Sequence, residues 1–142
     1  MLDYIPYTIM HNGKIIDLSR PQVMGILNVT PDSFFDGSRK QTEKEIAQRI
    51  EQICQEGASI IDIGAYSSRP NADVVSSKEE MARLQRGLKL LKDSAKNILL
   101  SVDTFRADIA KMCVEEYGVD IINDISGGTL DKDMFSMVAR LK

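Results

Sequence analysis

Two apolar runs, Ser59-Ile-Ile-Asp-Ile63 and Ile98-Leu-Leu-Ser-Val102, stand on either side of a helical pattern in this sequence. Within the pattern, apolar residues recur at the spacing of one helix face: Met81, Leu84, Leu88 and Leu91. Ser77 and Glu80 have the spacing of a capping box at the start of that helix. Short, near-continuous apolar runs are typical of strands covered on both faces, so the stretch predicts a strand–helix–strand unit with parallel strands.

The same alternation continues in both directions along the chain. Two further apolar runs are Val23-Met-Gly-Ile-Leu-Asn28 and Val119-Asp-Ile-Ile-Asn123, and a hairpin turning at His11-Asn12-Gly13 precedes them. Each remaining helix is expected to bury one stripe: Ile46, Ala47, Ile50, Ile53 and Cys54; Ile109, Cys113 and Val114; and Met134, Phe135, Val138 and Ala139. The sequence therefore predicts an α/β fold with four βα units after a short N-terminal β-hairpin, in a single domain over residues 1–142.

Two architectures fit four consecutive βα units. One is an open doubly wound sheet, and the other is the first half of a (β/α)8 barrel of the TIM-barrel type. A complete barrel takes about 250 residues, and the chain has 142. Hydrophobic periodicity does not choose between the two architectures.

A half-barrel has exposed sheet edges and an uncovered interior. We expect the interior to include some of these apolar residues: Ile26, Ile61, Leu99 and Ile121. An uncovered apolar strand edge is a template for pairing with another chain, so this architecture predicts a homo-oligomer.

Composition restricts the class of protein. The net charge of −3 argues against nucleic acid or an anionic membrane as a partner. No apolar run is long enough to span a bilayer, and the first residues do not resemble a secretory signal. Cys54 and Cys113 are expected to be buried free thiols, and the sole histidine, His11, is remote from both in sequence. These features predict a cytoplasmic protein without nucleic acid or a membrane as its partner.

Short polar side chains occur at or near the end of all four predicted strands: Asn28, Asp62, Asp103 and Asn123. Asp and Asn are also common helix caps and turn formers, which is the simpler explanation for any one of them. The carboxyl ends of parallel strands form the ligand-binding edge in both candidate architectures. Carboxylates and carboxamides together offer donors and acceptors, which suits a flat heterocycle better than a bare phosphate. A strand-end Asn can also give a neutral oxygen to Mg²⁺.

Three loops follow the strand ends. Residues 29–38 and 66–72 form loops longer than a simple connection requires, and they carry adjacent phenylalanines and a lone arginine, respectively. Both are predicted to be functional, although a solvated surface turn is the alternative. Ser126-Gly-Gly128 is predicted to be a tight turn rather than a phosphate cradle.

Four motifs resemble those of dihydropteroate synthases. Met24-Gly-Ile-Leu-Asn-Val-Thr-Pro-Asp-Ser-Phe-Phe-Asp-Gly37 resembles the first family signature, and Asp62-Ile-Gly-Ala-Tyr-Ser-Ser-Arg-Pro70 resembles the second. Ser101-Val-Asp-Thr104 and Ile121-Ile-Asn-Asp-Ile125 are similar to the family's pterin-binding strand ends. The resemblance covers the chain from about residue 7 onward and implies the N-terminal half of a (β/α)8 barrel.

The resemblance implies a transferase of folate biosynthesis. That family condenses 6-hydroxymethyl-7,8-dihydropterin pyrophosphate with p-aminobenzoate, giving 7,8-dihydropteroate and pyrophosphate. Asn28 would hold Mg²⁺ on the pyrophosphate, and Ser68 would help to bind the pterin pyrophosphate. The pterin would be bound by the following set: Asp62, Asp103, Asn123 and Ile125. Asp36 and Arg69, as catalytic residues, would close over the second substrate with Phe34 and Pro70.

The sequence also departs from the family. Ser68 stands where the family usually has Thr, which keeps the hydroxyl. The family's later Asp-Pro-Gly strand, Ser-Lys pair and Arg-x-His anion site have no counterpart, so the fragment alone is expected to be inactive. A pterin-binding methyltransferase and a non-catalytic half-barrel module are the alternatives, and the Thr30-Pro-Asp-Ser-Phe34 loop favours the synthase.

Overall fold

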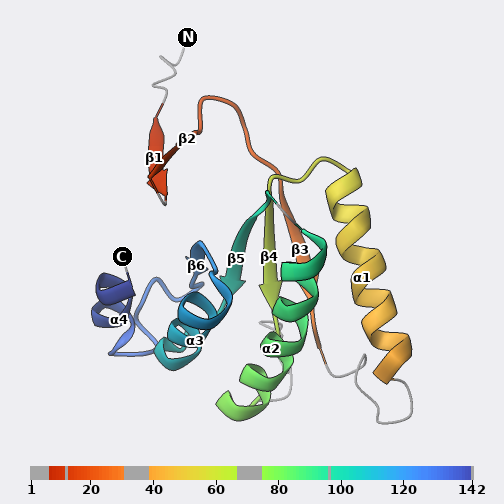
Figure 1. Cartoon of the computed structure of the whole chain (residues 1–142). Helices are drawn as coiled ribbons and strands as arrows, with labels where there is room; N and C mark the ends of the chain where they lie inside the picture. The colour runs from red at the N-terminus through yellow and green to blue at the C-terminus, as the bar shows by residue number, and fades with distance from the viewer. Residues whose placement is uncertain (1–6, 12, 31–38, 67–74, 96, 142) are drawn as a thin grey trace.

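A parallel β-sheet covered by helices forms the centre of the molecule (Figure 1). The computed structural model describes residues 7–11, 13–30, 39–66, 75–95 and 97–141. Its strands are β1 Thr8–His11, β2 Lys14–Asp17, β3 Met24–Asn28, β4 Ile60–Gly64, β5 Leu99–Asp103 and β6 Ile121–Asn123. Its helices are α1 Arg39–Gln55, α2 Ser77–Ser94, α3 Ala107–Tyr117 and α4 Met134–Leu141. The predicted order of elements is confirmed, with bounds that differ by a few residues.

The sheet has the strand order β3-β4-β5-β6, which is the order of the chain. Neighbouring strands are parallel, with Ile61 opposite Gly25 and Leu100, and Ile63 opposite Leu27 and Val102. The side chains in these two rows point to one face and are buried there under the helices: Leu27, Ile61, Ile63, Leu100 and Val102. The alternate rows, such as Ile26, Asp62, Ser101 and Ile121, point to the other face.

Helices α1 and α2 contact the sheet on that one face. A Cβ built on Gly25 of β3 would overlap a methyl group of Ile53 in α1, and one on Gly87 of α2 would lie 2.5 Å from Ile63 Cδ1. Two glycines thus let α1 and α2 approach the same side of the sheet. A doubly wound sheet would carry helices on both faces and reverse its strand order. The winding observed here is that of half a (β/α)8 barrel.

The hairpin β1–β2 lies beside the N-terminal end of β6 (Figure 1). His11 pairs with the carboxylate of Asp120, the residue before β6. The second oxygen of Asp120 accepts the Leu100 N–H at 2.8 Å. Asp120 therefore joins the hairpin to two strands of the sheet.

Several local expectations need correction. The cap of α2 is Ser76 rather than Ser77, since its hydroxyl accepts the Glu79 N–H at 3.2 Å. Ile61 faces the helices and is fully buried, whereas Ile26 on the opposite face is 60% exposed. From the register of the paired strands, Leu99 and Ile121 lie on the same uncovered face of the sheet as Ile26.

Helix α4 buries less than its stripe predicts. Met134 is buried, but Phe135 is 70% exposed and Val138 is 42% exposed. Ala139 is also exposed. The helix packs on α3, and β6 is an edge of the described sheet, so no strand beyond β6 covers its other side. No helix in the described ranges combines the length and the apolar character that a bilayer-spanning segment requires.

Candidate pterin-binding site

The predicted ligand residues meet at the carboxyl end of the sheet. Asn28, Gly64, Asp103 and Asn123 occupy one row, because the register pairs each with its neighbour. Their alternation with buried helix-facing residues directs them toward the face of the sheet that bears no helix. The structure thus brings together polar groups that are up to 95 residues apart in sequence.

Gly64 forms the floor between two of these side chains. A Cβ at this position would lie 3.5 Å from Asp103 Oδ2 and 3.6 Å from Asn28 Oδ1. Those are ordinary contact distances, so the missing side chain leaves a space that both oxygens border. A planar ligand could enter this space and meet a carboxylate and a carboxamide together.

Asp62 lies two residues before the end of β4, on the same face of the sheet as this row. It is opposite Ile26 and Ser101, and it is almost completely buried at 6% exposure. Its Oδ2 accepts a hydrogen bond of 2.9 Å from Asn123 Nδ2. Among the described residues, no group donates to Asp62 Oδ1 or pairs with Ser101 Oγ. A buried acceptor without a donor is costly, and a ligand N–H can satisfy it.

The site carries a concentration of negative charge. Burial raises the pKa of Asp103 above its ordinary value, and the nearby charges of Asp62 and Asp124 raise the pKa further. Burial is also the main cause of the raised pKa of the Tyr66 phenol, with Asp103 and Asp124 adding to it. Such an environment favours a ligand edge rich in N–H donors and disfavours a bare anion.

Asp124 has a structural role in the loop after β6. Its two oxygens accept the N–H groups of Ser126 at 2.8 Å and Gly128 at 2.9 Å. Gly127 and Gly128 both have positive φ angles, of 60° and 83°. The predicted tight turn is confirmed. Ile125 begins this turn with its side chain 70% exposed at the end of the sheet.

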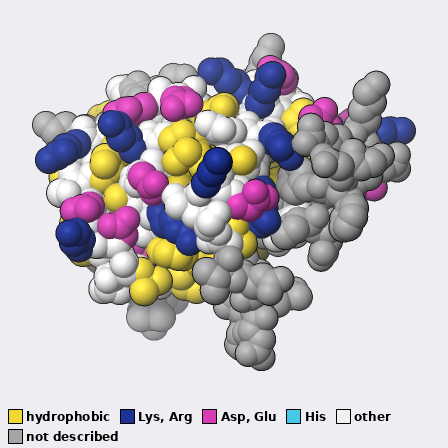
Figure 2. Space-filling view, turned by 90° about the horizontal axis from the view of Figure 1, so that it is seen from below, with side chains coloured by type: hydrophobic (Ala, Val, Ile, Leu, Met, Phe, Trp, Pro, Cys, Tyr) yellow, Lys and Arg dark blue, Asp and Glu magenta, His cyan; other side chains and the backbone are white. Residues whose placement is uncertain are grey.

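Part of the predicted site lies outside the described residues: Phe34, Asp36, Ser68, Arg69 and Pro70. Viewed from the end to which the strands point, the described surface has basic and acidic side chains interspersed with apolar patches (Figure 2). This pattern agrees with a small ligand rather than a polyanion.

The described residues contain no group of three or more His, Cys, Asp or Glu side chains arranged for a metal. Asn28 fits the predicted role of a single magnesium ligand, because its carboxamide oxygen borders the space beside Gly64. Mg²⁺ commonly binds through one or two protein oxygens and takes the rest of its ligands from substrate phosphates and water.

Residues 24–142 match the family described as pterin binding enzymes. The chain belongs to this family. The match includes all four strands of the sheet and each described residue of the predicted pocket.

Three relatives of this pterin-binding enzyme are informative. A folate synthesis bifunctional protein of Arabidopsis thaliana is 48% identical over 119 residues, which are 82% of this chain and 24% of the plant protein. A structure of Xanthomonas albilineans dihydropteroate synthase with 4-aminobenzoic acid has a TM-score of 0.78 at 34% identity. The matched region is 96% of this chain and 49% of the synthase chain. An Anaplasma phagocytophilum dihydropteroate synthase with bound 6-hydroxymethylpterin-monophosphate has a TM-score of 0.75 at 35% identity.

The chain spans about half the length of these two synthase structures. The region matched to the Anaplasma phagocytophilum synthase is 84% of this chain and 45% of the synthase chain. The synthases are TIM barrels, so the four-stranded sheet of this pterin-binding enzyme corresponds to about half of such a barrel.

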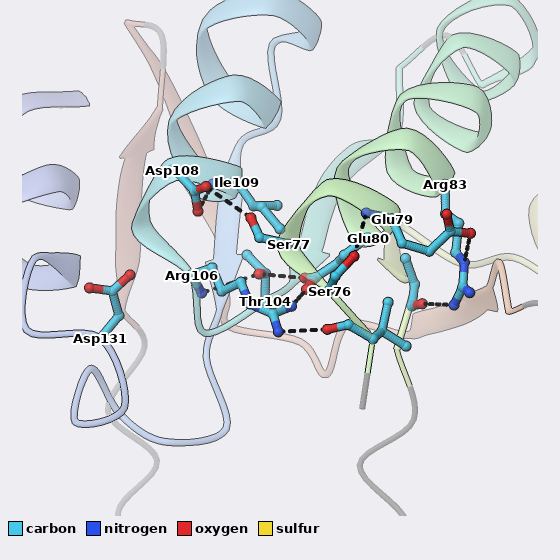
Figure 3. A network of polar contacts seen from close by, with 12 residues as sticks. Ser76, Ser77, Glu79, Glu80, Arg83, Thr104, Arg106, Asp108, Ile109 and Asp131 are labelled. Carbon is cyan, nitrogen blue, oxygen red and sulfur yellow. Dashed lines mark hydrogen bonds and ion pairs between the residues drawn. The ribbon is translucent and has the colours of Figure 1, made fainter. Parts of the chain in front are cut away.

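Glu80, expected from its spacing to form a capping box with Ser77, instead lies in a buried polar network near the end of β5. Figure 3 shows Glu80, Thr104 and Arg106 converging between the first turn of α2 and the start of α3. Glu80 precedes Leu84 by four residues, so it lies in phase with the apolar stripe of α2. A carboxylate in that phase predicts a buried charge that requires a cation.

Proposed function

We propose that this chain forms the pterin-binding half of a dihydropteroate synthase. The reaction would condense 6-hydroxymethyl-7,8-dihydropterin pyrophosphate with p-aminobenzoate and release pyrophosphate. The observation that carries the proposal is the row of Asn28, Asp103 and Asn123 above the buried, half-satisfied carboxylate of Asp62. A pterin presents N–H donors and ring acceptors along one flat edge, which matches carboxylates placed beside a carboxamide.

Each described residue takes a role that its position supports. Asp62 Oδ1 and the Asp103 carboxylate would accept N–H groups of the pterin, and Asn123 would orient Asp62 through its 2.9 Å hydrogen bond. Ile125 would pack against the ring with its exposed side chain. The fixed negative charge would also stabilise positive charge that develops on the reacting methylene as pyrophosphate leaves.

Asn28 would hold Mg²⁺ together with the pyrophosphate oxygens. Bound there, the ion would neutralise charge on the leaving pyrophosphate. Ser68 would help to bind the pterin pyrophosphate, and Arg69 and Pro70, with Phe34 and Asp36, would close over p-aminobenzoate, as their motifs imply. The proposal includes a cytoplasmic location, which the free thiols of Cys54 and Cys113 favour.

A binding measurement tests the proposal on the chain itself. Calorimetry with 6-hydroxymethylpterin monophosphate should show saturable binding, and Asp103→Ala should weaken it by about 1.5–3 kcal/mol through the loss of a charged acceptor. Asp93→Ala, at an exposed position near the end of α2, is the matched control and should bind normally. A folded wild-type chain without affinity for the pterin would contradict the proposal. Binding of methyltetrahydrofolate in its place would favour the methyltransferase.

A further inference from the structure

Glu80 is a fully buried carboxylate that the proposed chemistry does not use. Its Oε1 accepts a hydrogen bond of 2.7 Å from the hydroxyl of Thr104, and its Oε2 forms an ion pair with Arg106 (Figure 3). Burial of a charge is costly even when the charge is paired, and an apolar residue of similar volume often gives equal or greater stability. Stability alone therefore gives no reason for a carboxylate here.

The first partner of Glu80 connects it to the pterin pocket. Thr104 follows Asp103 directly, and its backbone N–H donates to the Asn123 carbonyl at 3.2 Å. The Thr104 hydroxyl also accepts the Arg106 N–H at 3.3 Å. Thr104 is fully buried, so these bonds hold it between the two residues proposed to face the pterin edge. A displacement of Thr104 would move Asp103 and Asn123 relative to each other.

The second partner connects Glu80 to Val75 and Tyr66. Arg106 Nη2 donates to the Val75 carbonyl at 2.8 Å, and the guanidinium lies 4.7 Å from the centre of the Phe105 ring. Phe105 meets Tyr66 edge to face, with 5.3 Å between ring centres. Val75 and Tyr66 flank residues 67–74. Arg106 therefore contacts one flank directly and the other through Phe105.

We propose that Glu80 is a positioning residue that couples the pterin site at the ends of β5 and β6 to Tyr66 and Val75. One carboxylate holds the end of β5 through Thr104, and through Arg106 it contacts Val75 and, by way of Phe105, Tyr66. A neutral residue could not fix the guanidinium and the hydroxyl at once with charge-assisted bonds. The expected effect of Glu80 on pterin binding rests on the proposed function. The contacts of Glu80 with Thr104 and Arg106 do not depend on it.

The test uses the full chain with two single variants and their combination. Glu80→Gln removes the charge that holds Arg106, and Thr104→Val removes the hydroxyl without changing shape. Each is expected to weaken binding of 6-hydroxymethylpterin monophosphate by about tenfold, the scale of one hydrogen bond to a charged group. Because the two act as a unit, the double variant should lose less than the product of the single losses.

Two controls separate positioning from stability. Thr104→Ser keeps the hydroxyl and should keep wild-type affinity. Glu115→Gln removes the exposed pairing with Lys111 on α3 and should also bind normally. Unchanged affinity in folded Glu80→Gln and Thr104→Val, with only a lower unfolding temperature, would overturn the proposal. If Glu80→Gln does not fold, Thr104→Val decides the question alone, since it alters no charge.

A spectroscopic readout works without ligand. The side-chain amide of Asn123 is bonded to Asp62 rather than to Glu80, so its NMR signals report on the pocket. Glu80→Gln and Thr104→Val should shift these signals, and Glu115→Gln should not. Unmoved Asn123 signals in both variants would overturn the coupling. Absence of pterin binding by the wild-type chain, with shifted signals, would contradict the proposed function and leave the coupling supported.

Discussion

Three aspartates at one end of the sheet have different environments. Both oxygens of Asp124 accept hydrogen bonds from backbone N–H groups of its own turn. Within the described part of the chain, only Oδ2 of Asp62 accepts a hydrogen bond, from the side-chain amide of Asn123. Asp103 is partly buried near both of their charges. The sequence predicted polar groups at the strand ends but could not distinguish these states, because they depend on partners from other strands. The unsatisfied oxygen of Asp62 and the disfavoured charge of Asp103 mark the positions where a ligand has most to contribute.

Asp103→Asn should stabilise the ligand-free protein at neutral pH. The pKa of Asp103 is raised on folding, so its protonated form favours the folded state, and this contribution is lost as pH rises from about 3.9 through the folded-state pKa. Asparagine does not titrate, so the variant's advantage over wild type should be larger at pH 7.5 than at pH 4. Urea unfolding midpoints at the two pH values measure this difference. A variant less stable than wild type at pH 7.5, with Asp93→Asn unchanged, would contradict the assigned environment.

At the scale of elements, the apolar stripes correctly predicted which segments are helices. They did not predict which element covers each helix. Leu84, Leu88 and Leu91 are completely buried, as the stripe on α2 predicted. The stripe on α4 predicted four buried residues, and only Met134 is buried. Periodicity identifies an apolar face, whereas burial also requires an element to cover that face. For the same reason, the spacing of Ser77 and Glu80 predicted a local capping box, whereas Glu80 pairs with Arg106 from a different βα unit.

Alanine at two strand glycines should affect different properties, stability at Gly25 and pterin binding at Gly64. A Cβ on Gly25 would overlap the Ile53 side chain of α1, so Gly25→Ala should destabilise the fold by about 1–3 kcal/mol. Gly64→Ala meets only ordinary contacts, but its methyl group would fill the space between Asn28 and Asp103. It should therefore preserve stability and weaken pterin binding. Thermal unfolding and pterin titration of both variants give the comparison. Normal pterin affinity in Gly64→Ala would place the ligand elsewhere.

For the whole molecule, sequence periodicity predicted four βα units and left two architectures open. The choice depends on strand order and on the face that each helix covers, and neither is encoded in a local pattern. Gly25 and Gly87 were visible in the sequence, yet only the structure shows that both admit helices to the same face. The opposite face carries the polar pocket near the strand ends and apolar residues below it. Met24 and Ile26 remain 40% and 60% exposed there.

That uncovered face leads us to expect that the chain associates with itself. Strands β3 and β6 are the edges of the described sheet, and exposed apolar side chains lie along its open side and on α4, including Ile26 and Phe135. Burial of even 1,000 Å² of apolar surface contributes on the order of 25 kcal/mol before the costs of association are counted. Light scattering at micromolar concentrations should therefore find dimers or larger species. Ile26→Lys should shift them toward monomer, because a charge on the open face opposes its burial. Ile15→Lys, at a 68% exposed position on the hairpin, should not. A compact wild-type monomer at every concentration would show that the open face does not drive association.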